Sequence, residues 1–276
     1  MNLQQTTSSW RLKGIILNKD NPTRESSRYR EGLTNEKKIP YRRIGFSCKT
    51  ANDNIIYVEV CGQIPQEVTI EREGEVPKGK KRETQRIPWE KKDTIPKGWK
   101  LRIPSYELVK QIHEGYHDGD SVILYGHISY NQHNGKVTPK YSISGISLST
   151  DPVNLNGEKF AEQNYFMQEL AVVNVEKRYD TVFLTGRMIS GTGLYTDYTF
   201  EIDQTVSNGL FAENVLSFSF GDMLKAWGVI HNRGIIDPKW NAVTGGKKCL
   251  EINRIDPESY KPGFFKPEDF SLNPSI

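Results

Sequence analysis

Residues 113–117, His-Glu-Gly-Tyr-His, match the pattern His-Glu-x-x-His, in which two histidines bind Zn²⁺ and the glutamate is a general base. That chemistry needs both histidines on one face of a continuous helix and a third ligand from elsewhere. Here Gly115 separates the histidines, Asp118-Gly119-Asp120 ends the helix, and no histidine occurs between His133 and His231. A zinc hydrolase is therefore the weak alternative, and we expect no catalytic residue, metal or cofactor.

The segment after this motif recurs later in the chain. Residues 119–128 are GDSVILYGHI and residues 221–230 are GDMLKAWGVI, so Gly, Asp, Gly and Ile coincide at a constant offset. Upstream, WRLKGIIL (10–17) resembles VFLTGRMI (182–189), each with a glycine after a leucine. Self-similarity in this order predicts a tandem repeat of a β domain.

The positioning elements follow from hydrophobic alternation. Residues 41–49 and 55–61 alternate between apolar and polar positions, as half-buried strands do. Residues 104–115 predict a short helix with Ser105 as its N-cap, and two further strands follow it. Three strands, a helix and two strands are the element order of the OB-fold, a five-stranded barrel that binds oligonucleotides. We predict a mainly β protein with two five-stranded Greek-key OB barrels in tandem, the first with long insertions.

The charge divides the chain in the same place as the repeat. Residues 1–150 contain 25 basic and 17 acidic residues, a net charge of +8, whereas residues 151–276 contain 12 and 17, a net charge of −5. We predict a basic nucleic-acid-binding domain over 1–150, a linker over 151–165, an acidic accessory or interaction domain over 166–256, and a Pro- and Phe-bearing tail over 257–276.

Binding of a single nucleic-acid strand needs cations along the phosphates and aromatic faces on which bases stack. The first half offers such residues on its second and third strands, in its two insertions and around its last hairpin. The predicted nucleic-acid-binding residues are Arg28, Tyr29, Arg30, Tyr41, Arg42, Arg43, Lys49, Tyr57, Lys80, Lys81, Arg82, Trp89, Trp99, Tyr130, Lys136, Lys140 and Tyr141.

The matching strand of the second half has a different outward face. In YTDYTFEID (195–203), Tyr198, Phe200 and Ile202 alternate inward and four polar residues, three of them acidic, point outward. Carboxylates there repel phosphate, so we expect the first copy to bind and the second to orient it or to contact a protein partner. An OB-fold protein-interaction module without nucleic-acid binding is the main alternative.

The quoted segments, together with YRRIGFSCKTANDNIIYVEVCG (41–62), resemble those of tandem OB-fold single-stranded-DNA-binding proteins of the bacteriophage type. This resemblance implies a protein that coats exposed single-stranded DNA during DNA replication or recombination and does not catalyse a reaction. Whether the protein also binds RNA is left open. The resemblance also implies replication or recombination proteins as partners through the second domain or the tail. The tail, KPGFFKPEDFSLNPSI, is only mildly acidic, unlike the strongly acidic ends of bacterial members.

The chain has features of a cytoplasmic protein. Its three cysteines are far apart and fit neither a disulfide framework nor a zinc ribbon. It contains no run of 18 apolar residues, and its first ten residues lack the basic and apolar regions of a signal peptide. We therefore expect a cytoplasmic location, in a bacterial host if the protein is phage-encoded, and no membrane partner.

Overall fold

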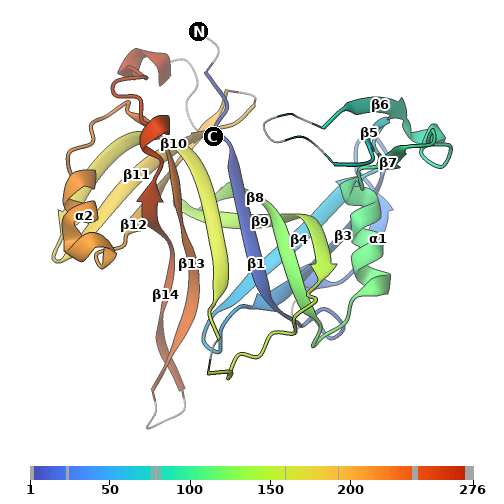
Figure 1. The fold of residues 1–276 in the computed structure, drawn as a ribbon, viewed down its shortest axis with the longest axis horizontal. Helices are drawn as coiled ribbons and strands as arrows, with labels where there is room; N and C mark the ends of the chain where they lie inside the picture. Colours follow the sequence, from blue (N-terminus) through green and yellow to red (C-terminus); the bar gives the residue numbers. More distant parts are fainter. Residues whose placement is uncertain are drawn as a thin grey trace. The chain divides into compact units, whose positions relative to one another are not determined.

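Five strands of the N-terminal half pair in a closed order (Figure 1). They are β1 (Ser8–Leu17), β3 (Pro40–Lys49), β4 (Ile55–Gln63), β8 (Ser121–His133) and β9 (Lys136–Leu148). The order β1-β8-β9-β4-β3 closes through a β1–β3 pairing, and we call this set the first barrel. The computed structural model describes residues 3–22, 25–75, 77, 80, 82–158, 160–191, 193–237 and 242–270.

The C-terminal half repeats this topology. Its strands are β10 (Gln163–Arg178), β11 (Thr181–Ile189), β12 (Tyr195–Ile202), β13 (Met223–Asp237) and β14 (Ala242–Ile255). The order β11-β12-β14-β13-β10 closes through β10–β11, and the third and fifth strands, β12 and β14, run parallel. We call this set the second barrel. Both sets have the strand order of an OB barrel, which confirms the predicted mainly β fold class.

The repeated Gly-Asp and Gly positions perform the same task in both copies. Asp120 accepts a hydrogen bond from the backbone of His117, and Asp222 accepts one from that of Ser219, each three residues earlier. Gly126 and Gly228 lie at bulges in β8 and β13. A Cβ at Gly126 would lie 1.8 Å from the Ser142 oxygen, and one at Gly228 would lie 1.9 Å from the Glu251 oxygen. Side chains cannot fit there, which explains why these letters recur.

Strands β1 and β10 pair antiparallel, so one sheet runs from the first barrel into the second. A buried polar network adds to this connection. Asn54, in the turn after β3, donates to Glu162 Oε1 at 2.8 Å and to the Ile230 oxygen at 2.9 Å, and it accepts from the Asn232 backbone at 2.8 Å. Asn164 exchanges two hydrogen bonds with the Ile230 backbone. These contacts fix the turn between β3 and β4 against β13.

The insertions in the first half form structure of their own. The first contains the 3-10 turn η1 (Glu25–Ser27) and strand β2 (Arg30–Leu33), which pairs with β3. The second contains a separate antiparallel sheet of β5 (Glu67–Arg72), β6 (Thr84–Pro88) and β7 (Trp99–Leu101), with the 3-10 turn η2 (Trp89–Lys91). Val68 and Ile70 give this sheet a small core. The alternation of Val68 and Ile70 covers too few positions to predict a strand from the sequence.

Helix α1 (Ser105–Gly115) follows β7 and agrees with the predicted helix. The predicted N-cap was wrong by one residue, because Pro104 occupies that position and no side chain caps the helix. Proline is well suited there since its ring lacks the donor that a helix start leaves unpaired. In the second half, the 3-10 turn η3 (Val206–Gly209) and helix α2 (Leu210–Val215) stand at the equivalent place.

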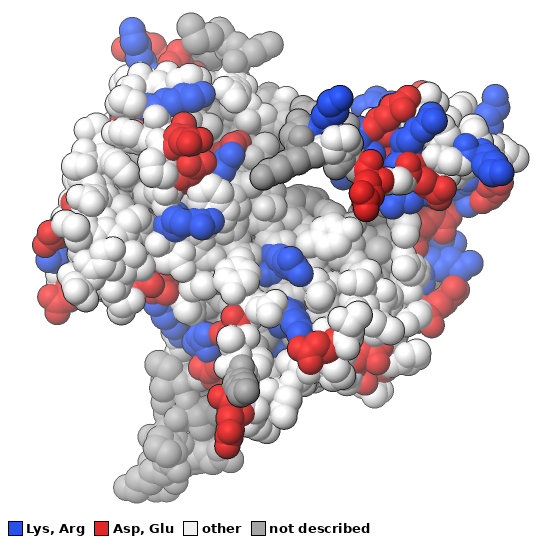
Figure 2. Space-filling model, viewed as in Figure 1, with Lys and Arg blue, Asp and Glu red and all other residues white. Residues whose placement is uncertain are grey.

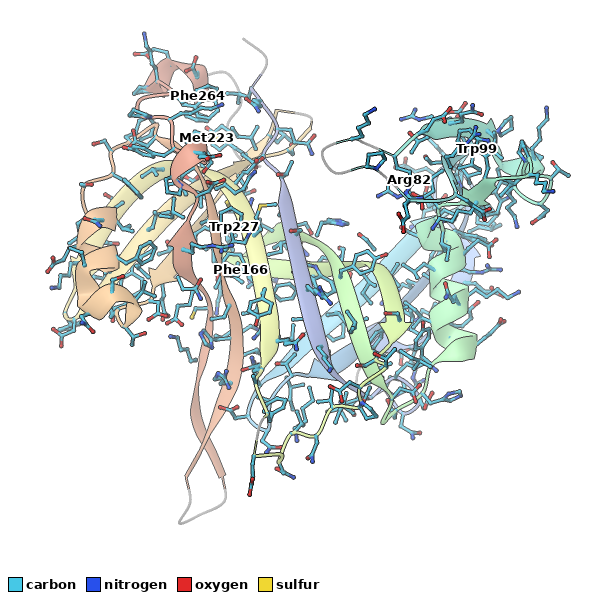
Figure 3. The ribbon with its side chains drawn as sticks, viewed as in Figure 1. Arg82, Trp99, Phe166, Met223, Trp227 and Phe264 are labelled. Carbon is cyan, nitrogen blue, oxygen red and sulfur yellow. The ribbon has the colours of Figure 1, made fainter. Side chains whose placement is uncertain are left out.

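The chain divides into two compact units. The first unit contains residues 1–17, 47–58 and 121–276, and the second contains residues 18–46 and 59–120. Within the first unit, the C-terminal segment with η4 (Pro257–Ser259) and η5 (Pro267–Phe270) packs on the second barrel. Its Phe265 and Phe270 are buried with Ala171, Ile189 and Met223, near the labelled Met223 and Phe264 in Figure 3.

Candidate nucleic-acid interface

Strands β3 and β4 have one buried and one partly exposed face, as the sequence predicts. The buried face consists of aliphatic, aromatic and thiol side chains at Ile44, Phe46, Cys48, Ile56, Val58 and Val60. The alternate positions hold Arg43, Lys49 and Tyr57, all of them half-buried. Lys49 and Tyr57 therefore stand at outward positions in the first unit, and Arg43 stands at an outward position of β3 in the second unit.

Arg42, next to this face in the second unit, is largely engaged within the protein. Its Nε lies 3.3 Å from Glu31 Oε2, and its Nη1 lies 3.8 Å from Glu107 Oε2. The guanidinium carbon is 4.1 Å from the centre of the Tyr106 ring. Two carboxylates and a ring therefore hold the Arg42 side chain. It serves mainly to position its neighbours, among them half-buried Tyr41, and less to bind a ligand.

The Arg28-Tyr29-Arg30 triplet is held by acidic residues around it. Both arginines pair with Glu25, Arg28 at 3.6 Å. The Tyr29 hydroxyl donates to Glu31 Oε2 at 2.8 Å. Burial and this hydrogen bond raise the pKa of Tyr29, so its hydroxyl keeps its proton and donates at neutral pH. Arg28 and Arg30 remain exposed, and pairs of this kind contribute little, so a phosphate can replace Glu25 as their partner.

The β5–β7 sheet carries a mixed surface of basic and acidic side chains (Figure 2). Trp89 lies edge-on to Tyr106 at 5.9 Å and under the Lys92 ammonium at 4.9 Å. Arg82 donates to the backbone oxygens of Arg72 and Gly74, at 2.7 and 2.9 Å, and closes the β5–β6 hairpin.

The same sheet also carries Trp99, whose ring lies 5.7 Å from the Arg72 guanidinium. Trp99 and Arg82 are labelled in Figure 3. Lys80 is exposed, and Lys81 lies outside the described residues. The structure therefore gives Arg82 partners in the β5–β6 hairpin, and Trp89 in η2 partners in Lys92 and in Tyr106 of α1, which the sequence did not reveal.

The predicted aromatic residues of the β8–β9 hairpin lie where the two barrels meet. The Tyr130 hydroxyl donates to Gln168 Oε1 at 3.0 Å, and its ring lies 5.2 Å from that of Tyr198 in β12. Tyr141 packs edge-on to the buried Trp10 at 6.3 Å. Burial raises the pKa of Tyr130 and Tyr141 well above its usual value. Exposed Lys136 and half-buried Lys140 belong to the same hairpin.

On the equivalent face of the second barrel, the carboxylates of β12 form ion pairs with cations of neighbouring strands. Arg187 in β11 makes a two-point ion pair with Asp197 in β12, at 2.7 and 2.8 Å. Its guanidinium lies between the rings of Tyr195, at 4.1 Å, and Phe270, at 4.5 Å. Glu201 pairs with Lys247 at 3.2 Å. The C-terminal segment thus covers one end of this face.

One exposed group was missed in the sequence. In the sheet formed by β8, β1 and β10, Arg11 lies directly between Tyr125 and Tyr165. The two tyrosines are 53% and 50% exposed. The sequence signal available for Tyr125 was its outward strand position next to buried Leu124. The β1–β10 pairing that brings Tyr165 beside Arg11 has no local signature in the sequence.

The His-Glu-x-x-His motif does not form a zincin helix. Helix α1 ends at Gly115, and the backbone of Tyr116 is extended, so His117 lies beyond the helix that carries His113. Among the described residues, no group of three His, Cys, Asp or Glu side chains is placed to hold a metal ion. Nor does any helix in the described ranges have the length and apolar character needed to cross a membrane.

Comparisons with known proteins give a family and related folds. A family model described as YorF matches residues 62–260. The wild-type single-stranded DNA binding protein from Thermus aquaticus is similar over 96% of this chain and 99% of its own, with 10% identity and a TM-score of 0.44. A deletion mutant of that protein gives the same identity and TM-score over 96% and 100%. No curated protein matches the chain in sequence.

Proposed function

The chain belongs to the YorF family, and we propose that it is a non-enzymatic protein that binds single-stranded DNA through phosphate neutralisation and base stacking. One observation carries the proposal. In the first unit, β3 and β4 hold Lys49 and Tyr57 at outward positions that alternate with buried Cys48, Ile56 and Val58, and β3 holds Arg43 at an outward position in the second unit. These are the second and third strands of the barrel, on which OB-folds bind oligonucleotides.

We assign the predicted site residues to two groups. Ligand contacts are assigned to the cations and aromatic residues on or near the surface, namely Arg28, Arg30, Tyr41, Arg43, Lys49, Tyr57, Lys80, Trp99, Lys136 and Lys140. Arg42, Arg82, Trp89, Tyr130 and Tyr141 are assigned to holding the surface in place. Arg42 pairs with two carboxylates, Arg82 bonds two backbone oxygens, and the three rings pack on other aromatic rings.

We further propose the division of labour that the charge predicts. Residues 1–150 bind the single-stranded DNA. Residues 166–256, which repeat the same fold in tandem, act as an accessory or interaction domain. Coating of exposed DNA in replication or recombination, in the cytoplasm of a bacterial host infected by a phage, fits this activity. Replication or recombination proteins are the partners that such a role requires.

The test is a titration of a fluorescent oligo-dT across salt concentrations, with duplex DNA and RNA of the same length beside it. We expect tight binding at low salt that weakens steeply as salt increases, because counterions are released from the phosphates. The triple variant Arg43→Ala, Lys49→Ala, Tyr57→Ala removes two phosphate contacts and one stacked base. It should weaken binding at least roughly fivefold and reduce the salt slope by about 1.4.

A matched control lies at the end of β10 and in the turn that follows it. The triple variant Lys177→Ala, Arg178→Ala, Tyr179→Ala removes the same charge and the same ring from an exposed site on the second barrel. It should leave both the affinity and the salt slope close to those of the wild type. Equal losses in the two variants would show that net charge, and not the β3–β4 face, governs binding.

A second candidate function is a protein-interaction module, which the exposed row of Tyr125, Arg11 and Tyr165 favours. Tyrosine and arginine are enriched in protein interfaces. This function is preferred if wild-type protein fails to bind any oligonucleotide at low salt.

A further inference from the structure

The second unit contains an open pocket of about 660 Å³ between the loop after β1 and the end of helix α1. The side chains that matter here are Lys19, Asp20, Arg28, Tyr29, His113 and His117. The pocket therefore joins two sequence features, the His-Glu-x-x-His motif and the basic triplet after β1. Its volume falls in the range of small-molecule sites.

One wall of the pocket is a ready-made stack of two flat rings. The Tyr29 phenol and the His113 imidazole lie 4.0 Å apart and within 6° of parallel. The Tyr29 hydroxyl is fixed by Glu31, and His113 is held by the last turn of α1. The His113 residue is exposed. Tyr29 covers one face of the imidazole, so a planar group would stack on the opposite face of His113.

The floor of the pocket is rigid, and its acidic group is already neutralised. The Lys19 ammonium, whose side chain is 3% exposed, donates to Asp20 Oδ1 at 2.8 Å and to the His113 backbone oxygen at 3.0 Å. Asp118 accepts from the Lys19 backbone at 2.8 Å. The hydrogen bond from Lys19 lowers the pKa of Asp20, so this carboxylate is ionised and paired. Its charge repels an anion less than a free carboxylate would.

The rim supplies groups that suit a phosphate. The Arg28 side chain is 62% exposed, and its partner Glu25, at 3.6 Å, is equally open to solvent. His117 is exposed, and its backbone is fixed by two hydrogen bonds with Asp120. An arginine fork and an imidazole at the rim match the geometry of phosphate recognition.

We propose that this pocket binds one nucleotide unit of the single strand, with its base stacked on His113 and its phosphate held by Arg28 and His117. This subsite rests on the proposed function and adds His113 and His117 to it. A divalent metal is a poorer match, since the described residues include no group of three ligand side chains. A stacked ring wall also selects a planar base over a free inorganic anion.

The first test measures oligo-dT affinity for variants of the stack. His113→Ala should weaken binding roughly fivefold to a hundredfold, as expected for the loss of one stacked base. His113→Phe keeps a flat ring and should restore most of the affinity. Glu114→Ala, an exposed change on the next residue of α1, should raise the affinity slightly or leave it unchanged. Wild-type affinity in His113→Ala would overturn the subsite and leave the proposed function intact.

The second test separates base from phosphate. Arg28→Ala should reduce the slope of log affinity against log salt by about 0.7, the value of one phosphate contact in a single strand. In NMR spectra of the full chain, dTMP should shift the imidazole signals of His113 and His117, and inorganic phosphate should shift His117 alone. Shifts with dTMP but no oligonucleotide binding would refute the proposed function and keep the nucleotide site. No shift of His113 with dTMP at millimolar concentration would overturn the site.

Discussion

One buried amide adds to the β1–β10 connection between the two barrels, and its removal has a calculable cost. Asn54 is 0% exposed, and its side chain forms three hydrogen bonds, two as donor and one as acceptor. Asn54→Ala leaves the Asn232 backbone donor without a partner and removes two further bonds. At about 1 kcal/mol per bond, plus desolvation of the orphaned group, the free energy of unfolding should fall by roughly 2–4 kcal/mol.

The control is two residues away in the same turn. Asn52 is exposed and donates to Asn156 at 2.7 Å, so Asn52→Ala should cost less than about 0.5 kcal/mol. Urea unfolding, followed by tryptophan fluorescence and circular dichroism, measures both variants. A loss for Asn54→Ala no greater than that for Asn52→Ala would refute the argument that this network holds the barrels together. Separate transitions by the two probes in Asn54→Ala alone would instead strengthen it.

Two further predictions concern titratable groups. The hydrogen bond between Glu251 and His231 lowers the pKa of Glu251 from 4.5, the value of a free carboxyl, to about 2. Burial of the carboxyl raises this pKa, and the contact with Lys247 lowers it further. The carboxylate therefore stabilises the fold fully above about pH 5 and loses this contribution as the pH falls from 4.5 to 2. Acid unfolding of Glu251→Gln should show a shallower pH dependence in that interval, and an unchanged profile would contradict the assignment. Burial raises the pKa of Cys48 to about 12 and that of Cys249 beyond its usual range, whereas Cys61 is exposed. A thiol reagent should label Cys61 in the native protein and the other two only after unfolding, and three equally fast reactions would count against the core packing.

The sequence predicts well what depends on near neighbours. The alternation in 41–49 and 55–61 identifies which side of β3 and β4 is buried, because side chains in a strand change faces at every residue. The Gly-Asp and Gly pairs at 119–126 and 221–228 mark a turn and a bulge that admit few other residues. These local constraints sufficed for the fold class.

What depends on distant partners was not predictable. Tyr130 meets Gln168 and Tyr198 only because β1 pairs with β10, and no local pattern encodes that pairing. Arg42 is held by Glu107, 65 positions along the chain, so its charge is largely used before any ligand arrives. Basic and aromatic composition therefore identified the candidate surface and overestimated how many of its members are available.

The second barrel shows why the same fold does not imply the same surface. The sequence predicts repulsion of phosphate by the carboxylates of β12, but Asp197 and Glu201 are both paired with cations. The Arg187 guanidinium is enclosed by Tyr195 and by Phe270 of the C-terminal segment. A base and a phosphate on this face would have to displace an aromatic ring and a carboxylate of the chain itself. Competition from within the molecule, more than repulsion, is therefore the physical reason to place strand binding on the first barrel.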